Sequence, residues 1–204
     1  LPLLIFILYL ITTISEVLVH KHIMHNNDDS FIRKLYGDSH IKHHKDVKHD
    51  MKLRSGYHNE GLYFSWSDSL YVSILTFILW YPVILLFYKF KWQYMIILSL
   101  FVGVIYKKLW DFLHFSFHQV TELEAYKSNP IYYWYFHNHA MHHLVKGEKK
   151  GNYNIIIPGG DYILGYYNTS VNNKEFCKKN KQHNYEICRK EANNEPLEHG
   201  FKWE

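Results

Sequence analysis

The chain has 204 residues and a formal net charge of +4, a length that suits one compact domain. Its Lys and Arg are scattered among Asp and Glu without a basic stripe carrying stacking aromatics, which excludes nucleic acid as the expected partner. The only two cysteines, Cys177 and Cys188, are too few for a zinc ribbon or a disulfide scaffold, and we expect free thiols in a reducing compartment.

The N-terminal segment predicts a membrane helix. Residues 1–15 carry no charge and are nearly all apolar, and Glu16 is followed by three more apolar residues, so we expect a membrane segment at about 1–19. Residues 20–66 are polar and rich in histidine, and the Asn, Asp and Ser residues at 26–30 indicate a loop.

Two further apolar segments predict a helical hairpin. Residues 69–88 carry no charge over about the length that crosses a bilayer, and Pro82 is expected to kink this helix. Residues 93–108 are short for a full crossing, which leaves a re-entrant or tilted helix open. The hairpin puts the polar segments before and after it on one membrane face. Lys and Arg are concentrated in those segments, so we expect that face in the cytosol.

We therefore predict an all-α protein, in which integral membrane helices carry a cytosolic helical domain over the membrane face. Residues 1–165 form this single domain. Residues 166–204 are rich in Asn, Lys and Glu, and we expect them to be a solvated polar tail.

Ten of the sixteen histidines fall into four short groups, which we call the histidine boxes. Side chains at positions i, i+3 and i+4 share one face of a helix, so three of the boxes project their imidazoles to one side. The fourth, with i, i+5 spacing, requires the helix to end or bend near His25. The boxes are His20/His25, His40/His43/His44, His114/His118 and His139/His142/His143.

Ten imidazoles are too many ligands for one metal ion and fit two. Imidazole suits iron, zinc, copper and nickel rather than magnesium or calcium. The remaining histidines are expected to be ordinary surface or core residues, with His22 and His137 close enough to substitute. Asp111 shares a helix face with His114 and could orient a ligand histidine through its other ring nitrogen. The segment ending at Asp161 could fold back as a strand or turn over the metals.

The order of the boxes, HxxxxH, HxxHH, HxxxH and HxxHH with a hairpin between the second and third, resembles the fatty acid hydroxylase superfamily. The stretches 109–118 and 137–143 are most similar to its fatty acid 2-hydroxylase branch. Residues 152–165 resemble the closing element of the family, with departures at Asn154 and Tyr166. We expect no fused haem domain in residues 1–204, because the His-Pro-Gly-Gly motif of cytochrome b5 is missing from them.

This resemblance implies a membrane-bound monooxygenase, an oxidoreductase of lipid biosynthesis. Two iron ions at the ten histidines, replaceable by zinc or other divalent metals, would use O₂ and two external electrons. The substrate would be a lipid, with an unactivated C–H bond of a fatty acyl chain hydroxylated. A separate donor such as cytochrome b5 or ferredoxin would supply electrons, and a eukaryotic member would reside in the endoplasmic reticulum.

Three alternatives remain open at this point. The same superfamily includes sterol oxidases, sterol desaturases and carotenoid hydroxylases. A membrane protein that handles zinc or iron without catalysis would also carry many histidines, although carriers place them within the spans or in loose repeats. A degenerate, inactive homologue is the third.

Overall fold

The computed structural model describes residues 1–26, 31, 34, 37–54, 62–119, 128–180 and 185–204. Within these ranges the protein is mostly helical and has no β-strand, only two isolated bridges. The all-helical part of the prediction is thereby confirmed. The elements are α1 (Pro2–Val19), the π-helix η1 (His20–Met24), α2 (Asp38–Asp46), α3 (Trp66–Phe87), α4 (Trp92–Phe117), α6 (Pro130–Leu144), the 3₁₀ turn η3 (Gly147–Lys149), α7 (Gly160–Leu164), α8 (Lys174–Lys179), α9 (Tyr185–Ala192) and the 3₁₀ turn η4 (Glu198–Gly200).

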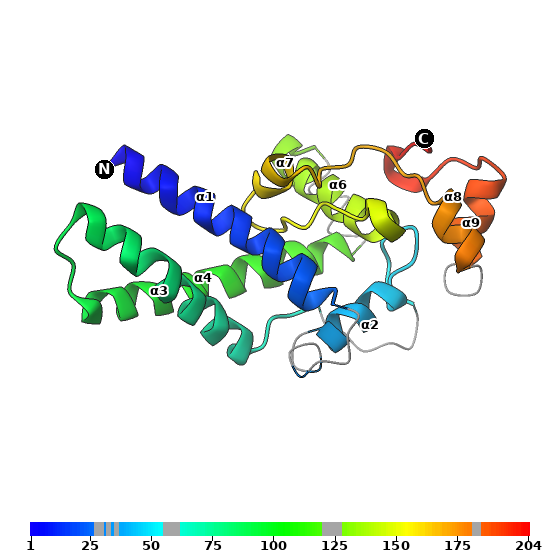
Figure 1. Ribbon diagram of the computed structural model, residues 1–204. Helices are drawn as coiled ribbons and strands as arrows, with labels where there is room; N and C mark the ends of the chain where they lie inside the picture. The colour runs from blue at the N-terminus through cyan, green and yellow to red at the C-terminus, as the bar shows by residue number, and fades with distance from the viewer. Residues whose placement is uncertain (27–30, 32–33, 35–36, 55–61, 120–127, 181–184) are drawn as a thin grey trace.

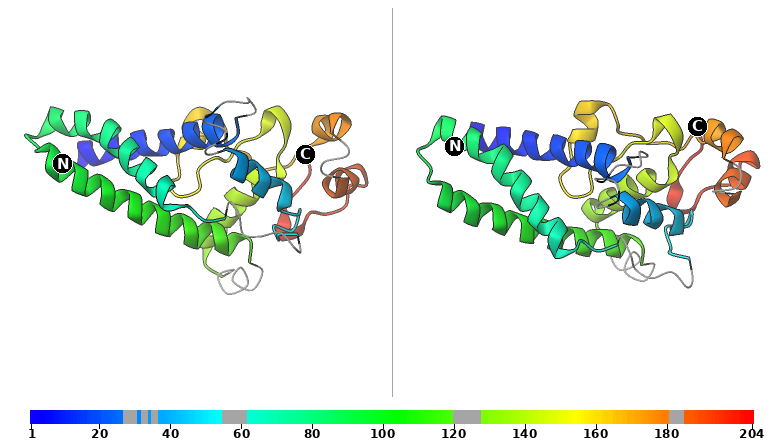
Figure 2. Two further views of the ribbon diagram at one scale, coloured as in Figure 1. Left: turned by 90° about the horizontal axis from the view of Figure 1, so that it is seen from below. Right: turned by 60° about the horizontal axis from the view of Figure 1, so that its bottom comes forward.

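The three longest helices, α1, α3 and α4, form one half of the molecule (Figure 1). The N-terminus and the α3–α4 connection lie at one end of this half, and α2 and α6 lie at the other end in all views (Figure 2). In the part of the chain that the structure describes, two helices are long and apolar enough to cross a membrane, Pro2–Met24 and Trp66–Phe87. Many of their large apolar side chains are exposed, as lipid-facing residues would be.

Helices α3 and α4 pack closely because small residues face each other where they meet. A Cβ atom added at Gly103 would come within 2.1 Å of Ser73 Oγ and 2.5 Å of the Ser69 carbonyl oxygen. Small residues four apart let helix backbones approach in this way. Helix α4 is longer than the predicted segment 93–108, since it continues to Phe117 and so carries the third histidine box away from the hairpin turn.

Local sequence explains where α3 begins and why it continues. Ser65 Oγ accepts a hydrogen bond from Asp68 N at 3.1 Å, while the Asp68 carboxylate accepts one from Ser65 N at 2.8 Å. This reciprocal pair satisfies two backbone N–H groups at the helix start. The helix continues through Pro82 to Phe87 as one uninterrupted element.

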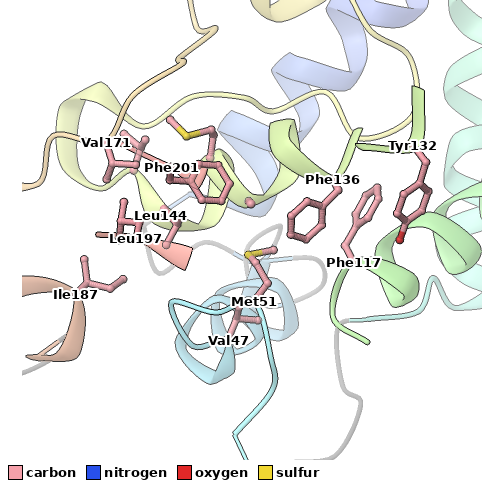
Figure 3. Packing of buried hydrophobic residues seen from close by; sticks show 13 residues of the cluster. Val47, Met51, Phe117, Tyr132, Phe136, Leu144, Val171, Ile187, Leu197 and Phe201 are labelled. Atoms are coloured by element: carbon pink, nitrogen blue, oxygen red, sulfur yellow. The ribbon is translucent and has the colours of Figure 1, made fainter. Parts of the chain in front are cut away.

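The main hydrophobic core lies around α6 and includes the C-terminal segment (Figure 3). The expectation that residues 166–204 form a solvated tail is therefore wrong, because four apolar residues of this segment are buried in the core. Polar bonds attach the segment as well: Asn173 Nδ2 donates to the Leu144 carbonyl oxygen at 2.8 Å and Asn173 Oδ1 accepts from Lys146 N at 2.9 Å. The carbonyl at the end of α6 thus gains a partner. The four residues are Val171, Ile187, Leu197 and Phe201.

The two cysteines are joined rather than free. Cys177 on α8 and Cys188 on α9 form a disulfide, so the expectation of free thiols is wrong. The sequence alone could not show the bond, because it depends on α8 and α9 lying against each other in the fold.

Candidate metal centre

All ten histidines of the boxes meet in two adjacent groups of five, each with nitrogen atoms within 4.8 Å of one another. The groups touch, since the His44 and His143 rings stack with centroids 4.0 Å apart. We name the first the cavity-side group, for reasons given below, and the second the core-side group. The cavity-side group is His20, His25, His40, His44 and His142, and the core-side group is His43, His114, His118, His139 and His143.

The two HxxHH boxes are shared between the groups. On α2, His40 and His44 belong to the cavity-side group while His43 belongs to the core-side group. On α6 the division is reversed, with only the middle residue, His142, in the cavity-side group. Each group therefore combines an i, i+4 pair from one box, a single ring from the other, and a two-histidine box.

The π-helix η1 explains how the i, i+5 box works. His25 N donates to the His20 carbonyl oxygen at 3.1 Å, an i→i+5 bond that widens the turn. A wider turn brings residues five apart nearly above each other, and the two rings stack with centroids 5.1 Å apart. The predicted local change of the helix is confirmed, and it is a π-turn.

Backbone carbonyl groups fix the orientation of four rings. His20 Nδ1 lies 2.6 Å from the Tyr153 carbonyl oxygen and His142 Nδ1 lies 2.9 Å from that of Gly151. Likewise His114 Nδ1 lies 2.9 Å from the Leu62 oxygen and His118 Nδ1 2.7 Å from the Met51 oxygen. A carbonyl only accepts, so each Nδ1 carries the proton and each Nε2 presents a lone pair to its group.

The distances among the Nε2 atoms fit a shared cation. In the cavity-side group, His40 Nε2 lies 2.9 Å from that of His20, 3.0 Å from that of His25 and 3.1 Å from that of His44. Two nitrogens bound at right angles to one ion at ~2.1 Å would be about 3.0 Å apart. One ring N–H can satisfy only one of these neighbours, and the other lone pairs need a positive charge between them.

The core-side group has the same spacing of Nε2 atoms, and several of its ring nitrogens have no hydrogen-bond partner. His139 Nε2 lies 3.2 Å from His118 Nε2 and 3.1 Å from His143 Nε2. His114 Nε2 and both ring nitrogens of His43 are buried without a hydrogen-bond partner. Buried polar atoms are seldom left without partners, so these nitrogens fit a metal ion.

Burial keeps the imidazoles in the neutral form that binds metals. Desolvation lowers the pKa of His118 to about 3 and lowers the pKa of His139, His142 and His143 well below the ordinary value. Nearby histidines add to the lowering, because each would repel a second positive charge. At neutral pH these four rings are therefore neutral and able to bind a metal ion.

Asp111 does not hold a ligand histidine directly, which corrects the prediction. Its carboxylate accepts from Phe64 N at 2.9 Å and pairs with Lys107 Nζ at 2.6 Å. The ring of His114 instead donates to Leu62. Asp111 thus acts one step away, by fixing the segment whose carbonyl orients His114.

Glu16 is a residue of the site that the sequence analysis missed. Its carboxylate accepts hydrogen bonds from Tyr106 Oη at 2.7 Å, Asn154 Nδ2 at 3.0 Å, and the backbone N–H groups of Ile156 and Ile157, both at 2.9 Å. It therefore clamps the segment 154–157 onto α1. A carboxylate in an apolar helix, one turn before His20, was the available signal.

Asp161 closes the same segment from its other end. Its carboxylate accepts from Tyr153 N at 2.9 Å and Asn154 N at 2.7 Å. This places the Tyr153 carbonyl on His20 and bears out the expected turn over the histidines. The Asn154 side chain donates a hydrogen bond to Glu16 and accepts one from Asp161 N, and so joins the two carboxylates into one network.

The other histidines that the structure describes lie outside both groups. His49 contacts Glu186 and Glu198, and His199 Nε2 lies near the Asp50 carbonyl. His22 and His137 also stay outside the groups. His58 and His183 lie outside the described residues.

A cavity of about 450 Å³ opens between α1, α3 and α4. Its walls are mostly apolar, from Ile5 and Leu79 near one end to Trp110 and His20 at the other. Ile5 lies on α1 and His20 directly follows this helix, fifteen residues later, or ~22 Å at the rise of a helix. The cavity thus leads from the apolar end of the helices to one ring of the cavity-side group.

No family model, no curated protein and no solved structure matches this chain.

Proposed function

We propose that this protein is a membrane-bound oxygenase with two metal ions, iron in the working enzyme, that hydroxylates a C–H bond of a lipid. The observation that carries the proposal is the apolar cavity ending on His20, a member of one five-histidine group. A metal group alone would serve storage or structure. A metal group at the end of a lipid-sized apolar cavity is suited to oxidising the molecule inside.

The length of the cavity favours an acyl chain. A volume of about 450 Å³ extended along much of α1 suits a slender, flexible molecule better than a broad rigid ring system. The side chains of Leu8, Val72 and Leu75 offer only apolar contacts, which would hold the chain by burial rather than by hydrogen bonds. Trp110 at the inner end would exclude water beside the reacting carbon.

The protein residues would bind and orient while the metals supply the redox chemistry. Ten histidines would hold two iron ions, which when bound would let O₂ react with an unactivated C–H bond. Tyr153 and Gly151 carbonyls keep His20 and His142 in the ligand tautomer. One oxygen atom would enter the C–H bond, and the other would leave as water with two electrons and two protons.

A separate protein would deliver the electrons. Cytochrome b5 or a ferredoxin is the donor we propose. His25 is the partly exposed member of the cavity-side group and offers the shortest approach from outside.

The proposal is tested by expressing the chain with such a donor under ¹⁸O₂ and analysing the lipids. A hydroxylated acyl product carrying one ¹⁸O atom is expected. No oxidised lipid from a protein that holds its metals and receives electrons would refute the function. A hydroxylated or desaturated sterol would instead favour the sterol branch.

A pair of neighbouring residues gives a matched control. Leu79 lines the cavity, whereas Ile78 is 59% exposed on the outer face of the same helix. Leu79→Trp should fill the cavity and lower product formation at least about tenfold without loss of metal, since an overpacked cavity excludes its occupant. Ile78→Trp should leave both unchanged, and equal activity of the two variants would contradict the assigned route.

A metal carrier is the second candidate, favoured by the number of histidines. Metal stoichiometry separates the two functions. A tight pair of ions, of which one is lost in His43→Ala and the other in His142→Ala, supports the oxygenase, because the two residues belong to different groups. Many weakly bound ions, insensitive to either change, would support the carrier.

We also propose that the protein is an integral membrane protein with its histidine end on the cytosolic side. Two helices of sufficient length and the Lys and Arg bias support this. The disulfide of Cys177 and Cys188 points to the oxidising side instead. Alkylation of intact cells with a membrane-impermeant thiol reagent after mild reduction decides between the two orientations.

A further inference from the structure

We propose that the two histidine groups have different roles. The cavity-side group holds an exchangeable ion, beside which the substrate's C–H bond is presented. The core-side group holds a closed ion that leaves the protein only when the core opens. The inference rests on the two-ion site of the proposed function and goes beyond it by assigning the groups unequal access.

Burial differs between the groups. His25 is partly exposed and His44 retains 8% exposure, so the cavity-side group has an edge near solvent. Every core-side ring is exposed by 4% or less. A chelator in water therefore meets the cavity-side group first.

The cavity also reaches only one group. Among the histidines of both groups, His20 alone lines the cavity. Trp110 lines it too, and its ring lies 4.9 Å from the His114 ring of the core-side group. The indole is 2% exposed and stands as a wall between the cavity and His114. A lipid in the cavity would thus approach the cavity-side ion.

The core-side group is packed against the main hydrophobic core. The Phe117 ring lies 5.2 Å from the His139 ring, and the Met51 carbonyl holds His118. Phe117, Phe136 and Met51 lie close together in Figure 3 as members of that core. Removing an ion from this group requires these side chains to separate, which is a rarer opening than solvent access to His25.

The test follows zinc release from the purified full chain in detergent after loading with two Zn²⁺ per chain. Zinc is the probe because it binds imidazole and has no redox chemistry. A water-soluble chromogenic chelator in excess should remove one ion quickly and the second at least about tenfold more slowly. Release of both ions at one rate would overturn the inference without any variant being needed.

Variants assign the phases to the groups. His25→Ala should abolish the fast phase and leave one slowly released ion, and His118→Ala should do the reverse. Trp110→Ala should open the wall and speed the slow phase, whereas Trp110→Phe should leave it near the wild-type rate. An unchanged slow phase in Trp110→Ala, or loss of the fast phase in His118→Ala, would contradict the assignment.

The outcomes remain separate from those of the lipid assay. Two release phases without any oxidised lipid would uphold the unequal groups and refute the oxygenase. Oxidised lipid with a single release phase would uphold the oxygenase and refute the unequal groups.

Discussion

The clamp formed by Glu16 allows a sharp test of how the histidine cover is held. Replacing Glu16 by Gln keeps the shape but turns one acceptor oxygen into a donor. The Oε2 position serves Asn154 Nδ2 and Ile157 N, while Oε1 serves Ile155 N, Ile156 N and Tyr106 Oη. In either amide orientation at least two buried N–H groups lose their acceptor.

The size of the effect follows from that count. Each buried donor left without a partner costs about 1–3 kcal/mol, so Glu16→Gln should destabilise the protein by about 2–6 kcal/mol. For a chain of this length each kcal/mol lowers Tm by about 2–4 °C. The Tyr153 carbonyl would also loosen from His20, because the clamped segment follows it directly.

The measurement combines thermal unfolding with hydrogen exchange at the Ile156 and Ile157 amides. Both amides should exchange faster in Glu16→Gln, and the cavity-side ion should be lost more readily. Tyr106→Phe is the control, because it removes one donor and leaves every backbone partner of the carboxylate in place, at a cost of about 0.5–1.5 kcal/mol. Wild-type stability and exchange in Glu16→Gln would refute the clamp.

Three further predictions concern acid, helix packing and the disulfide. The metal-free protein should lose stability as pH falls below ~6.5, because histidines of the unfolded chain take up protons there. A buried ring such as His118, with its pKa lowered to about 3, does not take up a proton in the folded state, so the loss at pH 5 is ~2 kcal/mol for such a ring. Chemical denaturation at several pH values measures this loss. Gly103→Ala should place its methyl group against Ser73 and destabilise by about 1–3 kcal/mol in an unfolding assay, with Val104→Ala as the neutral neighbour. Reducing the bond between Cys177 and Cys188, eleven residues apart, should cost about 3 kcal/mol and speed hydrogen exchange in α8 and α9; protection unchanged by reduction would contradict this.

The histidine boxes could be predicted because their spacing is a property of the helix itself. His40 and His44 share a face by helical geometry alone, and so do His139 and His143. Their division between two groups could not be predicted, since it depends on how α2 and α6 sit against each other. The hydrogen bonds from His114 and His118 to the carbonyl groups of Leu62 and Met51 could not be predicted either, because every residue has the same backbone carbonyl.

The long apolar helices could be predicted from the length of the uncharged segments, and the α3–α4 hairpin from the short turn between two of them. The closeness of α3 and α4 was missed, although Gly103 and the serines opposite carry a small-residue signal. The folding of the C-terminal segment against the core could not be predicted, because its composition is mostly polar. Its buried residues, such as Val171 and Phe201, are too far apart in sequence to form a periodic pattern.

The sharing of the two HxxHH helices has a consequence for assembly. Since α2 and α6 each give rings to both groups, an ion in the core-side group would hold the two helices in register and so pre-arrange His40, His44 and His142 for the next ion. Loading should then be ordered and cooperative, with the second ion gaining from an organisation that the first has already imposed. Loss of either HxxHH box would therefore remove ligands from both groups, whereas loss of a two-histidine box would weaken only one.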